Sequence, residues 1–196
     1  MSALQAVRSQ LEPGMVYRRA DLSKWSNAVD RHLTQLQNDK TLVKLSGGLY
    51  FCPKETVFGA APPSDRDLVE GFLKDGRFLL MSPSSYNRLG VGSTQLYNET
   101  VVYNHKRHGR FKLGNRYFQF VIKHFFPLEL TDEFLLVDLV DNLSKLAENR
   151  DLLLSRVKAK ALSLNYKNLK ATIDNYGNVR TQKLFSTLFL GETFDR

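Results

Sequence analysis

The order of elements in the first 54 residues constrains the fold of this chain more than any other feature. Apolar residues at helical spacing between Ala3 and Leu11 predict an amphipathic helix that Pro13-Gly14 stops. A short helix within 17–22 and a longer helix over Trp25–Asp39 follow. Two apolar strands then flank Ser46-Gly47-Gly48, where paired glycines supply the positive φ of a tight hairpin. Helix, turn, helix and hairpin in this order predict a winged helix-turn-helix, which places one helix in a major groove.

The length, charge and cysteine count of the chain limit the classes of protein to which it can belong. The 196 residues suffice for one medium domain or two small ones with a real core. A net charge of +8 suits a polyanionic partner, although a basic surface also serves solubility. Cys52 is the only cysteine, which excludes an intrachain disulfide and a cysteine-based zinc site and favours a reducing compartment. The chain has no signal-peptide pattern and no bilayer-spanning apolar run, so we expect a cytoplasmic protein without membrane contact.

A domain boundary is predicted at Ala60-Ala61-Pro62-Pro63, because two prolines remove two backbone donors and disfavour helix before them. We expect a DNA-binding domain over 1–59 and a second domain over 64–196. The second begins with a helix over 65–73, capped by Ser64 and ended by Gly76. Next we expect strands over 78–81, 100–104, 110–113 and 116–122, a helix over 82–89, and helices starting at 132, 151, 166 and 181. The predicted fold class is α+β: a winged helix-turn-helix, then a mixed domain with a small antiparallel sheet and C-terminal helices.

The predicted helix over 25–39 has two different faces. Ala28, Val29, Leu33 and Leu36 would pack on the first helix, while polar side chains on the other side suit base edges. Cations before the helices and on the hairpin suit phosphates. The candidate DNA contacts are Arg18, Arg19, Lys24, Ser26, Asn27, Arg31, Thr34, Gln35, Lys44 and Ser46. The alternative is an ordinary solvated helix face. Residues 1–58 hold eight basic and five acidic side chains, a net of +3, so we expect a homodimer on a repeated site.

A second basic region covers residues 104–124, which contain six Lys or Arg residues, three histidines and no acid. The aromatic residues Phe111, Tyr117, Phe118 and Phe120 alternate with the cations, so this sheet is a candidate RNA- or protein-binding surface. Its candidate residues are Lys106, Arg107, Arg110, Lys112 and Arg116. The simpler explanation is a half-buried sheet with its aromatics inside. Residues 155–183 are basic as well, with Asp174 as their one acid.

The sequence offers little for catalysis. His105 and His108 could share a metal, but no carboxylate lies in the surrounding segment to complete a site. Asp138 and Asp141 look like the polar edge of a helix. Gly92-Ser93 matches the start of a nucleotidyltransferase site, yet no Asp-x-Asp pair follows to hold magnesium. We therefore expect no enzyme activity, no catalytic residue, no cofactor and no metal.

The motifs together resemble a known family. Gly14-x-Val16-Tyr17, Asp21-Leu22 and Leu45-Ser46-Gly47-Gly48-Leu49-Tyr50-Phe51-x-Pro53 resemble the N-terminal winged helix of AbiEi-family antitoxins. Leu89–Gln95, Val102-Tyr103 and Phe111–Arg116 are similar to the second domain of AbiEi-like relatives. The resemblance covers roughly residues 14–125. It implies a bacterial autorepressor that binds inverted repeats in its own promoter and opposes a nucleotidyltransferase-like toxin. The residues that carry over are the turn glycines Gly47 and Gly48.

Overall fold

The fold is that of a computed structural model, which describes residues 2–82, 84–91, 99–145 and 149–190. It divides into two compact units. The first unit consists of residues 1–76 and 110–118, and the second of residues 77–109 and 119–196. The chain is a mixed α+β protein with small antiparallel sheets and C-terminal helices, as the sequence predicts.

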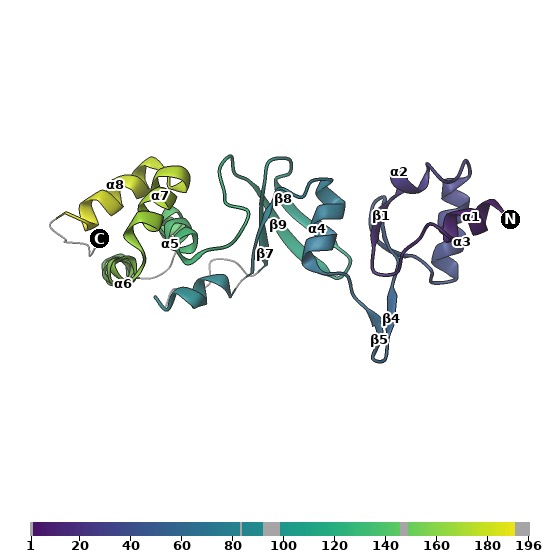
Figure 1. Ribbon diagram of the computed structural model, residues 1–196, viewed down its shortest axis with the longest axis horizontal. Helices are drawn as coiled ribbons and strands as arrows, with labels where there is room; N and C mark the ends of the chain where they lie inside the picture. Colours follow the sequence, from purple (N-terminus) through teal and green to yellow (C-terminus); the bar gives the residue numbers. More distant parts are fainter. Residues whose placement is uncertain (1, 83, 92–98, 146–148, 191–196) are drawn as a thin grey trace. The chain divides into compact units, whose positions relative to one another are not determined.

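The first unit begins with the predicted succession of helices and strands (Figure 1). Its elements are α1 (Ala3–Arg8), β1 (Val16–Arg18), α2 (Arg19–Leu22), α3 (Val29–Asn38), β2 (Val43–Ser46), β3 (Leu49–Phe51), β4 (Lys54–Thr56), β5 (Gly59–Ala61) and α4 (Asp65–Leu73). Strands β1 and β2 pair antiparallel with the two edges of β3. In the part of the chain that the structure describes, β4 and β5 form a second, two-stranded sheet.

Helices α1 and α3 share one apolar core with the strands. Val7, Leu33 and Leu36 are buried in a cluster that also contains Leu42 and Tyr50. A capping box starts α1, where Ser2 and Gln5 satisfy each other's backbone amides. Helix α3 is four residues shorter at its start than predicted, because the Ser26 hydroxyl accepts from the Ala28 amide and forms a turn before it.

Two turns differ from their predicted details. Only Gly48 of the glycine pair has a positive φ, at 70°, so the hairpin needs one glycine there and not two. Helix α4 is capped by Ser64 as expected, but it ends at Lys74, whose φ of 51° is left-handed, and not at Gly76. The predicted boundary at 60–63 lies within the first unit, since α4 groups with the preceding residues.

The second unit combines strands with helices. Its elements are β6 (Leu79–Met81), the 3₁₀ helix η1 (Ser85–Leu89), β7 (Thr100–Asn104), α5 (Asp132–Asp141), the 3₁₀ helix η2 (Leu143–Lys145), α6 (Arg150–Ser163), α7 (Tyr166–Tyr176) and α8 (Val179–Leu188). Strands β8 (Gly109–Leu113) and β9 (Arg116–Ile122) are divided between the units, since residues 110–118 belong to the first unit. The order of this four-stranded sheet is β6-β7-β9-β8. The predicted helix over 82–89 is a 3₁₀ helix, and Pro83 lies outside the described residues.

Helix α5 is the centre of the second unit's core. Thr131 caps it by accepting from the Phe134 amide at 3.1 Å, as predicted. Seven consecutive residues from Phe134 to Val140 are buried, so this helix has no solvent-facing stripe along that stretch. Helices α6, α7 and α8 contribute Val157, Leu169 and Phe185 to the same cluster.

Candidate nucleic-acid interface

The exposed face of α3 presents a row of polar side chains. Arg31, Thr34 and Gln35 are exposed, while Val29, Leu33 and Leu36 are buried on the other side. The spacing of three and four residues puts the exposed three on one surface of the helix. Arg31 has no ion-pair partner in the described parts of the chain, so its guanidinium is available to a ligand. Asn27 is exposed one turn earlier, just outside the helix.

An acidic side chain on the same face is already neutralised. Arg19 donates from Nε to Asp30 Oδ1 at 2.7 Å and from Nη2 to Asp30 Oδ2 at 2.5 Å. The hydrogen bond from Arg19 lowers the pKa of the Asp30 carboxyl and raises that of the Arg19 guanidinium. The bidentate pair therefore removes a charge that would repel phosphate. It also makes Arg19 a neighbour of the α3 face and not a separate contact.

Arg18 and Ser26, two of the predicted DNA contacts, bond to other residues of the first unit. The Arg18 guanidinium donates to the carbonyls of Gly71 (2.5 Å) and Phe72, where it satisfies the end of α4. Ser26 is buried, and its hydroxyl lies 2.8 Å from His32 Nδ1, which is buried too. The helical pattern misplaced Ser26, because the turn before α3 directs its side chain inward.

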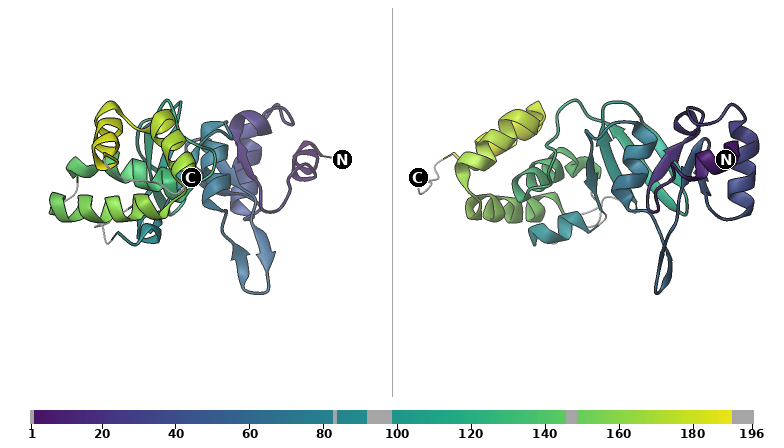
Figure 2. Two further views of the ribbon diagram at one scale, coloured as in Figure 1. Left: turned by 60° about the vertical axis from the view of Figure 1, so that its left-hand side comes forward. Right: turned by 45° about the vertical axis from the view of Figure 1, so that its right-hand side comes forward.

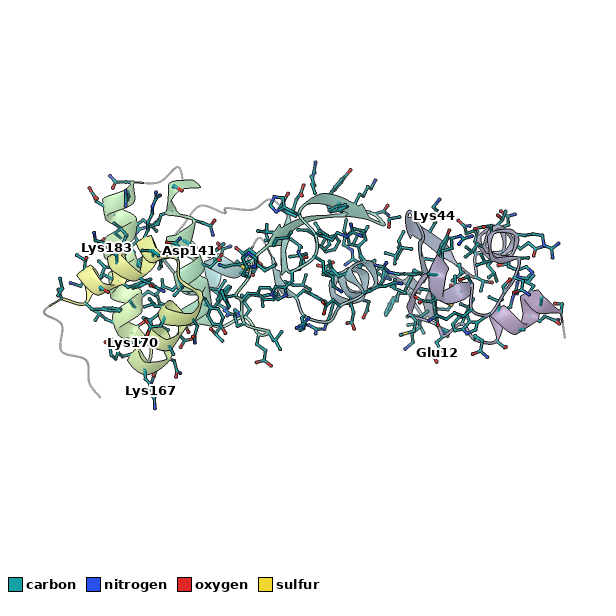
Figure 3. The ribbon with its side chains drawn as sticks, turned by 90° about the horizontal axis from the view of Figure 1, so that it is seen from above. Glu12, Lys44, Asp141, Lys167, Lys170 and Lys183 are labelled. Carbon is teal, nitrogen blue, oxygen red and sulfur yellow. The ribbon has the colours of Figure 1, made fainter. Side chains whose placement is uncertain are left out.

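The remaining candidates of the first unit come before and after α3 in the sequence. Lys24 is exposed, 3.6 Å from Asp21 across a loose ion pair. Lys44 is exposed on β2 (Figure 3). Ser46 points inward instead, since its Oγ is buried and lacks a hydrogen-bond partner among the described residues. The structure thus leaves seven candidates exposed. Arg19 is paired with Asp30, and the other six are Lys24, Asn27, Arg31, Thr34, Gln35 and Lys44.

The second basic region falls into both units. Arg110 and Lys112 are exposed on β8 in the first unit, with the Arg110 guanidinium carbon 4.2 Å and Lys112 Nζ 5.5 Å from the centre of the Tyr117 ring. Arg116 is half-buried and bonds to Asp65 and the Pro63 carbonyl. Lys106 and Arg107 lie in the second unit, in the turn after β7, where Asn104 accepts from both backbone amides.

The aromatic residues of this region separate into two faces. Phe118 and Phe120 are fully buried, and Phe111 is half-buried with its ring centre 5.0 Å from that of Phe72. Tyr117 alone of the four is exposed. The half-buried-sheet explanation therefore accounts for most of the pattern, and one exposed tyrosine beneath two cations remains.

Sequence reasoning missed a buried polar cluster around Asp138. This residue is fully buried and does not form a polar edge of α5. Its carboxylate accepts from the Tyr86 hydroxyl, from the Tyr103 hydroxyl at 2.9 and 3.0 Å, and from Lys123 Nζ at 2.8 Å. The sequence offered no sign of its burial, because its hydrogen-bond partners come from segments up to 52 residues away.

The polar cluster around Asp138 has a structural role in the core of the second unit. Lys123 is one-fifth exposed, lies 4.8 Å from the Tyr103 ring centre, and also approaches Asp141 at 3.5 Å. Four donors on one buried carboxylate, Asn142 Nδ2 being the fourth, satisfy its charge, which is what a structural buried anion requires.

Within the described ranges, no group of three His, Cys, Asp or Glu side chains is arranged to hold a metal ion. His105 stacks on Phe126, with ring centres 4.8 Å apart, and its Nε2 lies 3.1 Å from the His124 carbonyl. Gly92-Ser93, and Gly92–Gln95 of the resembling stretch, lie outside the described residues. No helix in the described parts of the chain is long and apolar enough to cross a membrane.

No protein-family model matches this chain, and no curated protein matches it either.

Proposed function

We propose that this chain is a sequence-specific DNA-binding transcriptional regulator. In this proposal residues 1–59 form a winged helix-turn-helix, α3 enters the major groove, and β2–β3 is the wing. The observation that carries it is the row Arg31, Thr34 and Gln35, exposed opposite a buried apolar face. Arg pairs with guanine and Gln with adenine through two hydrogen bonds to the base edge. Lys24 supplies a phosphate contact beside the helix.

The regulatory role extends this proposal through the resemblance to AbiEi-family antitoxins. The regulator would bind inverted repeats in its own promoter as an autorepressor, and it would oppose a nucleotidyltransferase-like toxin. Co-expression tests the second half: this chain would restore growth to cells that produce such a toxin encoded beside it. Continued growth arrest with the chain present at full level would refute the antitoxin role and leave DNA binding intact.

The first experiment measures binding to the duplex upstream of the chain's own gene. A scrambled duplex and a single-stranded RNA are the competitors, at two salt concentrations. We expect selective, salt-sensitive binding to the upstream duplex. Arg31→Ala should weaken that binding by about tenfold to a hundredfold and relax the preference, since a bidentate base contact is lost.

Arg180→Ala is the matched control, because Arg180 is an exposed arginine on α8 in the other unit. It removes the same charge and should leave the preference for the upstream duplex unchanged. Equal binding to all three nucleic acids, or an equal loss in both variants, would show that the surface acts by charge alone.

A second candidate function is favoured by the Arg110–Tyr117 contact. An exposed tyrosine beneath a guanidinium can stack on an unpaired base or bind an acidic protein segment. Under this reading Arg110→Ala with Lys112→Ala would abolish single-stranded RNA binding, while Arg31→Ala would leave it unchanged. The same experiment therefore separates the two functions.

A further inference from the structure

The β4–β5 hairpin ends in two exposed apolar side chains. Val57 is 93% and Phe58 98% exposed, more than any other large apolar residue in the described ranges. The hairpin extends away from the other elements of the first unit (Figure 2). A fully exposed aromatic side chain contributes none of the stabilising free energy that its burial would provide.

The turn that carries Phe58 is ordered. Thr56 Oγ1 donates to the Gly59 carbonyl at 2.6 Å and accepts from the Phe58 amide at 3.2 Å. Gly59 has a φ of 98°, which strongly favours glycine. Among the described residues, the two strands pair only with each other, over three residue pairs. An isolated two-stranded hairpin is marginally stable in water, so a contact that covers it would stabilise it.

The same unit contains an apolar pocket of about 300 Å³ near the base of this hairpin. Its lining includes Val43, Leu45, Phe51, Pro63, Leu68 and Leu113. A cavity of about 150 Å³ accommodates benzene, so this pocket has room for a phenyl ring. Phe58 of the same chain does not fill it, because that side chain is almost wholly exposed.

Charges identify the kind of partner. The hairpin carries one cation, Lys54, and one anion, Glu55, and this balance gives no attraction to a nucleic acid. Lys44 lines the pocket and Glu55 lies two residues before the apolar tip; both are exposed. Neither forms an ion pair within the described part of the chain, so each is available to pair with the opposite charge on a second copy.

We propose that two copies of this chain dimerise by exchanging hairpin tips. Phe58 of each copy occupies the apolar pocket of the other, and Glu55 of each copy pairs with Lys44 of the other. The contact uses the same surfaces on both copies, as a two-fold dimer requires. It concerns oligomeric state alone and does not depend on DNA binding. It also assigns Lys44 to the dimer contact and not to phosphate.

Sedimentation of the full chain without nucleic acid tests this proposal across a range of concentrations. We expect a concentration-dependent species of twice the 22.5 kDa chain mass. Phe58→Asp should raise the dissociation constant by about a hundredfold or more, because each dimer loses two buried aromatic rings. The side chain is exposed in the single chain, so the far-ultraviolet circular dichroism spectrum should stay unchanged.

Val179→Asp is the matched control: it places the same charge on an exposed apolar residue of α8, in the other unit, and should leave the dimer intact. Charge reversal provides a second test. Glu55→Lys and Lys44→Glu should each weaken the dimer, and the two combined should restore it.

Four results would overturn the proposal: a single-chain mass at every concentration, a dimer unaffected by Phe58→Asp, equal loss in Val179→Asp, or a charge-reversed pair no better than either single variant. Failure here leaves the DNA-binding test separate, since Arg31 lies outside the proposed contact and is measured by duplex selectivity.

Discussion

Replacing Asp138 with alanine would leave the buried hydroxyls of Tyr86 and Tyr103 and the ammonium of Lys123 without their acceptor. Breaking a buried charge pair from one side destabilises a protein by about 3–5 kcal/mol. We expect Asp138→Ala to lower the free energy of unfolding by about this amount in urea denaturation.

Asp174→Ala is the control for that measurement. It removes an exposed carboxylate that pairs with Lys170 at 2.9 Å, four residues earlier on α7 (Figure 3). Exposed pairs of this spacing contribute about 0.3–0.5 kcal/mol. If both variants unfold at the same urea concentration, the Asp138 cluster contributes nothing beyond a surface pair.

Cys52 provides a second prediction at the scale of one residue. The side chain is 6% exposed, and burial raises the pKa of its thiol. We expect the native protein to react slowly with a thiol reagent at neutral pH and to react fast once urea unfolds it. Because the native state favours the protonated thiol, its contribution to stability is present below the ordinary thiol pKa of about 8.5 and is lost as pH rises through the native value. Rapid labelling of the folded protein would contradict this.

At the scale of elements, the contact of α4 with β1 depends on Gly71. A Cβ built there would lie 2.6 Å from Val16 Cγ1, closer than real contacts allow. We expect Gly71→Ala to destabilise the protein by about 1–3 kcal/mol through overpacking, measured by urea denaturation.

Gly47→Ala is the matched control, since a Cβ at Gly47 meets nothing within 4 Å. It should change the free energy of unfolding by less than about 0.5 kcal/mol. An equal change in both variants would mean that the close approach to Val16 is relieved by small shifts.

The sequence predicted most elements and the α+β class, because those depend on local signals. Ser64 and Thr131 cap their helices, and Gly114, with a φ of 61°, turns between β8 and β9 as its position indicates. The sequence did not predict the placement of side chains whose hydrogen-bond partners are distant in the chain. Arg18 is held by carbonyls 53 and 54 residues away, and Asp138 by residues from three other segments. Polar residues of this kind look the same in sequence whether they face water or a partner.

For the whole molecule, the net charge of +8 predicts that duplex binding weakens with salt. Each phosphate contact adds about one to the slope of log affinity against log salt concentration. We expect Lys24→Ala to lower that slope by about one and to weaken binding equally for all duplex sequences.

Lys167→Ala removes the same charge from an exposed position on α7 and should leave the slope unchanged (Figure 3). A slope that falls equally in both variants would mean that the duplex is attracted by total charge and not held at Lys24.

Helix α5 shows what a buried carboxylate does besides stabilise. The hydrophobic effect has no preferred direction, so burial alone specifies the rotation of a helix that is buried all the way round less strictly than a polar contact does. Asp138 specifies the rotation, because turning it away from Tyr86, Tyr103 and Lys123 would leave a fully buried carboxylate without its donors. Leucine at this position would stay buried but would no longer fix the rotation of α5 about its axis. The second unit would then keep its helices while its side chains sampled several packings.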